Sequence, residues 1–145
     1  MKNRFKFRAY VKSLKAIFPV VLIDFRNETV LVDVSNGEAD PPEYRFDEVV
    51  LMQCTEMEDK SGQLAWEGDV IKAHYANAQK AEHIETIRFC HGKFVSEGKL
   101  GSGGTIRSDL ADSVLRFRHD ETVYMDWFEV IGNVHMNPEL LEVAQ

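Results

Sequence analysis

The sequence predicts a mainly β protein with a barrel-like body and little helix. Three observations support this class. Apolar and polar residues alternate near the start, short β-branched runs recur along the chain, and turn-forming residues separate these runs. Many short strands with frequent turns are typical of all-β barrels and sandwiches.

Residues 5–12 carry a clear strand pattern with period two. Successive side chains of a strand point to opposite faces of its sheet. We therefore expect one set of residues to enter the core and the other to form a solvent-facing basic stripe. The core set is Phe5, Phe7, Ala9 and Val11, and the stripe is Lys6, Arg8, Tyr10 and Lys12.

The next region predicts a hairpin followed by a broken strand. Residues 20–25 and 29–34 are β-branched runs with a three-residue connection between them. Residues 41–42 are both proline and mark a loop, because a proline pair does not fit a central strand. Apolar residues 44–46 and 49–53 then predict a strand that is interrupted between them.

Turn residues organise the middle of the chain. Residues 59–62, with Asp first and Gly last, predict a type I turn. Strands are expected at 70–75 and 84–89, and residues 91–93 predict a tight hairpin after the second of them. Residues 98–105 include four glycines and predict a flexible surface loop.

Two short helices and one strand are predicted in the last third. Residues 108–117 have helical spacing of apolar side chains and a serine as N-cap. Residues 127–131 predict a strand. Asn137, Pro138 and Glu139 supply an N-cap, an N1 proline and a first-turn acid, which predicts a short C-terminal helix.

Composition indicates a folded globular protein. The chain has 145 residues, of which 44% are hydrophobic and 28% charged, and this balance argues against disorder. We expect neither a membrane span nor a secretory signal, because no apolar run reaches 18 residues. Cys54 and Cys90 are too few for a disulfide framework, so we expect reduced thiols in the cytosol, both as small apolar side chains.

Charge is distributed unevenly along the chain. Lys and Arg number 17 against 24 Asp and Glu, which gives a net charge of −7. Residues 1–15 hold six basic side chains and no acid, whereas the rest of the chain holds 11 basic and 24 acidic ones. This pattern excludes a uniformly basic DNA-binding coat, but it is compatible with a basic edge on an acidic body.

Three blocks of sequence resemble the YopX family of phage and prophage proteins. They cover residues 6–10, 46–70 and 129–141, and the similarity is weakest over residues 76–122. This chain departs from the family's usual pattern at two places. The family usually has a glycine after the threonine at position 55, where this chain has Glu56. It also has an aliphatic-aromatic pair before Glu-Gly-Asp, where this chain has Ala65 and Trp66. The motif residues of the last two blocks are Trp66, Glu67, Gly68, Asp69, Gly132, Asn133, Asn137 and Pro138.

The resemblance implies a β-rich N-terminal part over residues 1–54. It implies an SH3-like barrel with a short C-terminal helix over residues 55–145, and we expect the two parts to form one compact unit. It also implies a phage or prophage origin and the bacterial cytoplasm. It implies no activity and no catalytic residues, and the motif residues have the chemistry of turns and strands rather than of an active site. Trp66 is expected to pack as an apolar anchor beneath the turn at Gly68.

Other chemistry in the sequence is weaker. Residues 98–105 approach a phosphate-binding loop but have glycine where its lysine is required. His74, His83, Cys90 and His91 lack the paired spacing of a zinc site, so we expect no metal and no cofactor. The acidic group Glu56, Glu58, Asp59, Glu67 and Asp69 is interpreted as a solvated turn, and we expect no enzyme activity.

The basic stripe leaves three interpretations open. It can be an edge strand whose charges prevent aggregation, a docking surface for the acidic body of a second copy, or a nucleic-acid contact in which Tyr10 stacks on bases. We favour a non-enzymatic binding or assembly module that self-associates or binds a host or phage protein. The alternative is nucleic-acid binding through the basic stripe.

Overall fold

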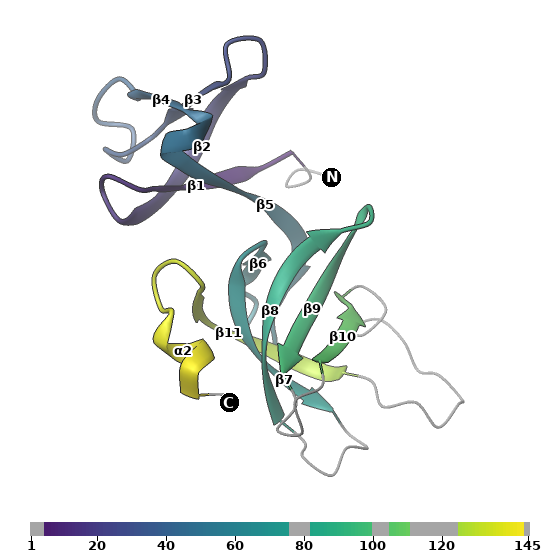
Figure 1. The fold of residues 1–145 in the computed structure, drawn as a ribbon. Coiled ribbons are helices and arrows are strands. Elements are labelled where there is room, and N and C mark those ends of the chain that lie inside the picture. Colours follow the sequence, from purple (N-terminus) through teal and green to yellow (C-terminus); the bar gives the residue numbers. More distant parts are fainter. Residues whose placement is uncertain (1–4, 76–81, 100–104, 111–124, 144–145) are drawn as a thin grey trace. The chain divides into compact units, whose positions relative to one another are not determined.

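The computed structural model describes residues 5–75, 82–99, 105–110 and 125–143 (Figure 1). The described residues are mainly β with a short helix near the C-terminal end, which confirms the prediction of a mainly β protein. The chain divides into two compact units, unit 1 over Met1–Cys54 and unit 2 over Thr55–Gln145. Among the described residues, no helix has the length and apolar character needed to cross a membrane.

Unit 1 is an antiparallel sheet with strand order β4-β3-β2-β1-β5. A 3₁₀ turn, η1, interrupts the chain between β4 and β5, which confirms the predicted break. The elements are β1 (Phe7–Val11), β2 (Ala16–Asp24), β3 (Thr29–Val32), β4 (Glu43–Arg45), η1 (Phe46–Glu48) and β5 (Val49–Glu58).

The core of unit 1 lies on the predicted face of β1. Ala9 and Val11 are fully buried there, and Ala9 lies between Phe18 on β2 and Leu51 on β5. The assignment of Phe5 to this core is wrong, because its side chain is 80% exposed. Phe5 precedes the first residue of β1, so no neighbouring strand covers it.

The hairpin between β2 and β3 is held by a carboxylate at its entrance. Asp24 Oδ1 accepts the N–H groups of Arg26 and Asn27 at 2.9 and 3.0 Å. Asn27 donates hydrogen bonds to this carboxylate from its backbone and from its side chain, and these bonds lower the pKa of Asp24. Side chains that accept backbone N–H groups in this way fix the direction of a turn, and the predicted connection is confirmed.

Unit 2 contains the end of β5 and the remaining strands. β6 neighbours β5, and a second antiparallel sheet has the order β10-β9-β8-β7-β11. The elements are β6 (Leu64–Trp66), β7 (Asp69–Tyr75), β8 (Glu82–Cys90), β9 (Lys93–Lys99), β10 (Thr105–Asp109), β11 (Met125–Asn133) and α2 (Glu139–Val143).

The predicted hairpin after β8 is confirmed. Cys90 pairs with Lys93, and the two residues between them, His91 and Gly92, have φ values of 52° and 79°. Two positive φ values define the type I′ turn, whose twist matches that of the flanking strands.

Ser108 lies in β10, opposite Ser96 of β9, so the prediction that it caps a helix is wrong. Pairing with β9 overrides the weak local helical spacing. Asp109 is the last residue of β10, and Leu110 has a helical backbone. Residues 111–117 of that predicted helix and the centre of the predicted loop at 98–105 lie outside the described residues.

The sheet of unit 2 curves strongly around its core. β8 and β9 separate β7 from β10, and three strand spacings in a flat sheet span about 14 Å. Even so, the hydroxyl oxygens of Tyr75 on β7 and Ser108 on β10 lie 3.2 Å apart. The buried residues inside this curve are Ala65, Ile71, Ala73, Tyr75, Ile87, Leu110, Met125 and Phe128.

Candidate interaction face

The predicted basic stripe lies on the face of β1 opposite the core of unit 1. Because Ala9 and Val11 face the core, the even-numbered residues of the strand face the other way. We call this surface the outer face of unit 1. It consists of Lys6, Arg8, Tyr10 and Lys12, their cross-strand neighbours Ile17, Pro19, Val50 and Met52, and the pair Leu22 and Leu31 farther along β2 and β3. Met52 is the buried member of this set.

β1 is a central strand of its sheet and not an edge. Arg8 lies opposite Pro19 of β2 on one side and Met52 of β5 on the other. Tyr10 likewise lies between Ile17 and Val50. The edge-strand interpretation of the stripe is therefore wrong, since hydrogen bonds to β2 and β5 occupy both sides of β1. The pairing of β1 with β5 is non-local, so the sequence pattern of β1 alone does not reveal the central position of the strand.

The outer face combines lysines that have no carboxylate partner among the described residues with exposed apolar side chains. Lys12 donates from Nζ to the carbonyl oxygen of Asp47 at 2.8 Å. Among the described residues, neither Lys6 nor Lys12 forms an ion pair with a carboxylate. Leu22 is 49% exposed, and Pro19 is exposed as well. Apolar area next to unneutralised charge is the composition of a docking surface rather than of an inert sheet face.

A β-bulge at Val21 shapes the far end of this face. Val20 pairs with Val32 of β3, whereas Leu22 pairs with Leu31, so Val21 is an extra residue in β2. Its side chain is 59% exposed. The bulge keeps Val20 in the core and places Leu22 on the outer face, beside Leu31.

The motif Trp66-Glu67-Gly68-Asp69 forms the turn from β6 into β7. Gly68 has φ of 85°, in the left-handed region that favours glycine. Asp69 Oδ2 accepts the N–H of Trp66 at 2.9 Å, while Glu67 is half-buried. The side chain of Trp66 is half-buried, whereas the preceding Ala65 is fully buried in the core of unit 2.

The second motif places helix α2 against the end of β11. Asn137 Oδ1 accepts the N–H of Asn133 at 3.2 Å, so this side chain bonds back to the strand, and α2 begins after Pro138. A methyl group at Gly132 would lie 2.6 Å from Leu140 Cδ1 and 2.7 Å from Asn137 Oδ1. The helix thus approaches the strand closely because residue 132 has no side chain.

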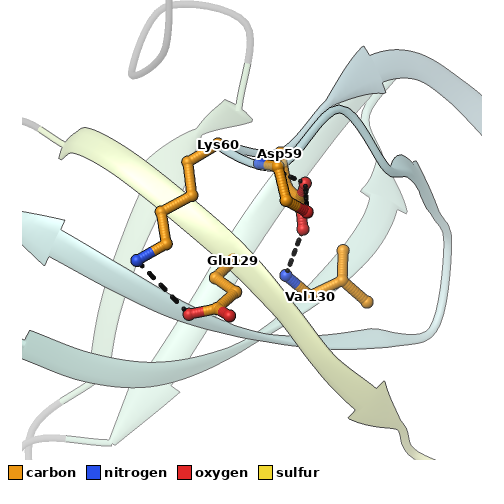
Figure 2. A network of polar contacts seen from close by, with 5 residues as sticks. Asp59, Lys60, Glu129 and Val130 are labelled. Carbon is orange, nitrogen blue, oxygen red and sulfur yellow. Dashed lines mark hydrogen bonds and ion pairs between the residues drawn. The ribbon is translucent and has the colours of Figure 1, made fainter.

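The turn at residues 59–62 is tied to β11 by one carboxylate (Figure 2). Asp59 Oδ1 accepts the N–H groups of Ser61 and Gln63, and its Oδ2 accepts the N–H of Val130 at 3.0 Å. Burial acts to raise the pKa of Asp59, but the hydrogen bonds from Val130, Ser61 and Gln63 outweigh it, and the pKa is lowered. The predicted turn is confirmed, with Gly62 at φ of 86°.

A cation–aromatic cluster lies beside this turn. The ammonium of Lys60 is 3.5 Å from Glu129 Oε2 and 4.0 Å from the centroid of the Trp127 ring. His74 stacks on Trp127 with centroids 4.9 Å apart and planes at 3°, and its Nδ1 lies 3.7 Å from Asp126. Lys60 and Glu129 neutralise each other, and Trp127 packs against both Lys60 and His74, so the cluster braces β7 and β11.

A buried acid that the sequence analysis missed lies on the inner face of unit 2. Glu85 is fully buried, and its Oε2 accepts the hydroxyl of Tyr75 at 2.6 Å. The hydroxyls of Ser96 and Ser108, from β9 and β10, belong to the same inner face. Burial raises the pKa of Glu85 above its usual value, and the hydroxyl groups of Tyr75 and Ser96 act in the opposite direction. Burial likewise raises the pKa of Tyr75.

The histidines and cysteines do not gather around a common point. His83 lies edge-on to Tyr75, and His91 is in the β8–β9 turn next to Cys90. No group of three or more His, Cys, Asp or Glu with metal-binding geometry occurs within the described ranges. In the acidic group around residues 56–69, Asp59 and Asp69 are buried and bonded to backbone N–H groups.

Comparison with known proteins finds a matching family model and a similar solved structure. A family model described as YopX protein matches residues 6–142. Among solved structures, the chain is similar to the crystal structure of protein EF1440 from Enterococcus faecalis, with 26% identity and a TM-score of 0.59. That alignment covers 94% of this chain and 96% of the other. No curated protein matches the chain.

Proposed function

The chain belongs to the YopX family, and on that premise we propose that it is a non-enzymatic phage or prophage accessory protein of the bacterial cytoplasm. Its role in this proposal is binding and assembly, with a second copy of the chain as the partner. The buried acids Asp59 and Asp69 support a structural rather than catalytic use of the polar residues, because each one accepts backbone N–H groups inside the fold. Glu85 accepts the hydroxyl of Tyr75 through Oε2, while its buried Oε1 has no hydrogen-bond partner among the described residues.

The observation that carries this proposal is the composition of the outer face of unit 1. It presents Lys6 and Lys12 without acidic partners among the described residues, and the side chains of Pro19 and Leu22 on the same face are exposed. An apolar surface with charged neighbours suits a protein partner, since the apolar area supplies affinity and the charge supplies orientation.

Charge complementarity favours a second copy of the chain as that partner. Unit 1 contains eight basic and eight acidic residues, whereas unit 2 contains nine basic and sixteen acidic ones. Unit 2 therefore has a net charge of −7, opposite in sign to the stripe on β1. Contact between the stripe of one copy and unit 2 of another lowers the electrostatic free energy of both surfaces.

Nucleic-acid binding through the same stripe is the competing proposal. Tyr10 lies among the cations and offers a ring for base stacking. The acidic charge of unit 2 opposes it, because phosphate groups are repelled by a unit of net charge −7. A host or phage protein with an acidic surface is a further partner that would use the same residues.

We also propose that unit 2 closes as an SH3-like barrel. Two contacts support closure: the N–H of Lys60 donates to the carbonyl oxygen of Phe128 at 3.0 Å, and Asp59 accepts the N–H of Val130. Together they make the β5–β6 turn a hydrogen-bonded neighbour of β11. Backbone hydrogen-exchange protection of the N–H groups of Lys60 and Val130 would support closure, and rapid exchange at both would contradict it.

Sedimentation equilibrium tests the assembly proposal directly. We expect the wild-type protein to exceed its monomer mass of 16.6 kDa at about 10–100 µM, where weak homo-oligomers assemble. The double variant Lys6→Glu, Lys12→Glu should shift the population toward monomer. Lys15→Glu, Arg26→Glu is the matched control, because it makes the same charge change at exposed turns of unit 1.

Two outcomes would contradict the proposal. A monomeric wild type across this concentration range would exclude self-association. Equal weakening in the matched control would show that net charge, and not the outer face, governs assembly. A fluorescence assay with single-stranded DNA at low salt tests nucleic-acid binding. That proposal requires DNA binding that weakens steeply as the salt concentration rises and is lost in the Lys6→Glu, Lys12→Glu variant.

A further inference from the structure

The segment from Met136 to α2 presents an acidic and apolar surface. Met136 is 45% exposed, and Glu139 and Glu142 are exposed on α2. Leu140 is half-buried and lies against Gly132 of β11. The hydrogen bond between Asn133 and Asn137 fixes the start of the segment, so its outward side chains are held in position by the strand beneath them.

The acids on α2 lack compensating charge. No basic residue occurs in its last turn, and Glu142 lies near the C-terminal end, where the helix dipole disfavours an anion. Glu139 and Glu142 are three residues apart and therefore neighbours on the helix surface, which makes them repel each other. Within the described part of the chain, neither of them forms an ion pair.

Three other acids of unit 2 have cationic partners. Glu97 pairs with Arg88 at 3.5 Å and also with Arg107. Asp109 pairs with Lys93 at 3.0 Å, and Glu129 pairs with Lys60. The two acids of α2 differ from these three, because no Lys or Arg among the described residues neutralises them. A cationic surface brought to α2 would therefore gain interactions that Glu97, Asp109 and Glu129 do not offer.

We propose that the segment Met136–Glu142 of one copy docks on the outer face of unit 1 of another copy. This inference rests on the proposed self-association and names the two surfaces that meet. Lys6 faces the carboxylates of Glu139 and Glu142, while Met136 packs on the apolar neighbours Pro19 and Leu22. Lys12, six residues farther along β1, adds attraction at longer range. Each surface supplies what the other lacks: cations for the uncompensated helix acids, and an apolar cover for exposed strand side chains.

Charge reversal on the helix separates this inference from the proposed function. Glu139→Lys, Glu142→Lys should weaken self-association about tenfold or more, because like charges facing each other across an interface are strongly unfavourable. Glu58→Lys, Glu82→Lys is the matched control, since it reverses two exposed acids of unit 2 that have no ion pair among the described residues. Circular dichroism spectra and melting curves establish that each variant is folded.

Mixing complementary variants identifies the copy that each segment binds. The Lys6→Glu, Lys12→Glu variant and the Glu139→Lys, Glu142→Lys variant should each be largely monomeric alone and should associate when mixed. In the mixture, the native helix of one meets the native face of the other, and the two reversed surfaces also have opposite charges. Persistent monomers in the mixture would overturn the inference, as they are the result expected when the helix binds the face of its own chain.

A third outcome distinguishes the two proposals. If the Glu139→Lys, Glu142→Lys variant self-associates as strongly as its matched control, the role of α2 is refuted. The assembly proposal is then still supported by self-association of the wild-type protein. A monomeric wild-type protein would refute both. To cover misfolding of the double variants, the single variant Met136→Ser should also weaken assembly, and an unchanged dissociation constant would count against the apolar contact.

Discussion

The carboxylate of Asp59 accepts the backbone N–H of Val130 at 3.0 Å across 71 residues of sequence. The same carboxylate accepts the N–H of Ser61 at 2.9 Å and that of Gln63 at 3.0 Å. One side chain therefore forms the β5–β6 turn and also occupies a backbone donor of β11. Because a buried donor without an acceptor is costly, the identity of residue 59 matters for both elements.

We predict that Asp59→Ala lowers the free energy of unfolding by about 2–4 kcal/mol, since it leaves several backbone donors without acceptors. Urea denaturation followed by tryptophan fluorescence measures this loss. Glu58→Ala, at an exposed position next to it, should cost far less. An equal loss in the two variants would show that the Asp59 hydrogen bonds are not the cause.

The pKa of Asp59 gives that prediction a pH dependence. Its hydrogen bonds lower the pKa in the folded state below the value of 3.8 for an ordinary aspartate. The folded form thus holds its proton less tightly than the unfolded chain does, and stability is lost as pH falls through this range. Wild-type stability should decline below about pH 4 more steeply than that of Asp59→Ala. Parallel curves would contradict this linkage.

We predict the opposite pH effect for Glu85. Burial raises its pKa in the folded state above the ordinary value of 4.5, so the unfolded chain releases the proton first as pH rises. The free energy of unfolding then falls between the unfolded and the folded pKa. Glu85→Gln, which fills the same volume and still accepts the Tyr75 hydroxyl, should raise the melting temperature at pH 7–8 by about a few degrees.

Melting curves from pH 4 to pH 8 check the Glu85 prediction. The advantage of Glu85→Gln should grow with pH and nearly vanish at the acid end of the range. Glu82→Gln, at an exposed position of the same strand, is the control and should leave the curve unchanged. A lower melting temperature for Glu85→Gln at every pH would mean that the carboxyl stabilises the fold in both protonation states.

Glu56 is expected to be a position where glycine stabilises the fold. Its φ is 63°, in the left-handed region that is unfavourable for side chains with a Cβ atom. Glycine is also the residue usual in the family after this threonine. Glu56→Gly should raise the free energy of unfolding by about 0.5–1 kcal/mol, whereas Glu58→Gly should lower it by a similar amount because residue 58 has no such conformation. Urea denaturation of the pair decides the sign.

Gly132 is expected to tolerate no side chain. Gly132→Ala would bring a methyl group to 2.6 Å from Leu140 Cδ1, and we predict a loss of about 1–3 kcal/mol as α2 is displaced. A double-mutant cycle with Leu140→Ala provides the check, because removing the leucine methyls makes room for the new group. The two losses should then be less than additive, and strict additivity would contradict the steric cause.

The sequence predicted those elements whose pattern is local. The turn at Asp59, the hairpin at His91 and Gly92, and the alternation over β1 each depend on residues close together in the chain. The central position of β1 was not predicted, because it depends on pairing with β5 some forty residues later. The edge interpretation of the basic stripe failed for the same reason.

Glu85 shows what the sequence contained but did not make clear. It shares the parity of Ile87 on β8, and that parity places both side chains in the core. An acid on an apolar face is normally assigned to solvent, since burial of a charge is unfavourable. The compensating hydroxyl of Tyr75 comes from the neighbouring strand, so it is visible only in the folded structure. The sequence pattern assigns Ser108 to the start of a helix, because local helical spacing does not reveal its pairing with Ser96, twelve residues earlier in the chain.

The bulge at Val21 means that the length of β2 is adjustable at one position. Val20 and Ile23 face the core on either side of it, although a regular strand would place residues three apart on opposite faces. Deleting Val21 would join Val20 to Leu22 in unbroken antiparallel register and leave every other side chain on its present face. Relatives of this chain that are shorter by one residue in β2 can therefore keep the same core, and an alignment that places the gap anywhere else in the strand would exchange its two faces.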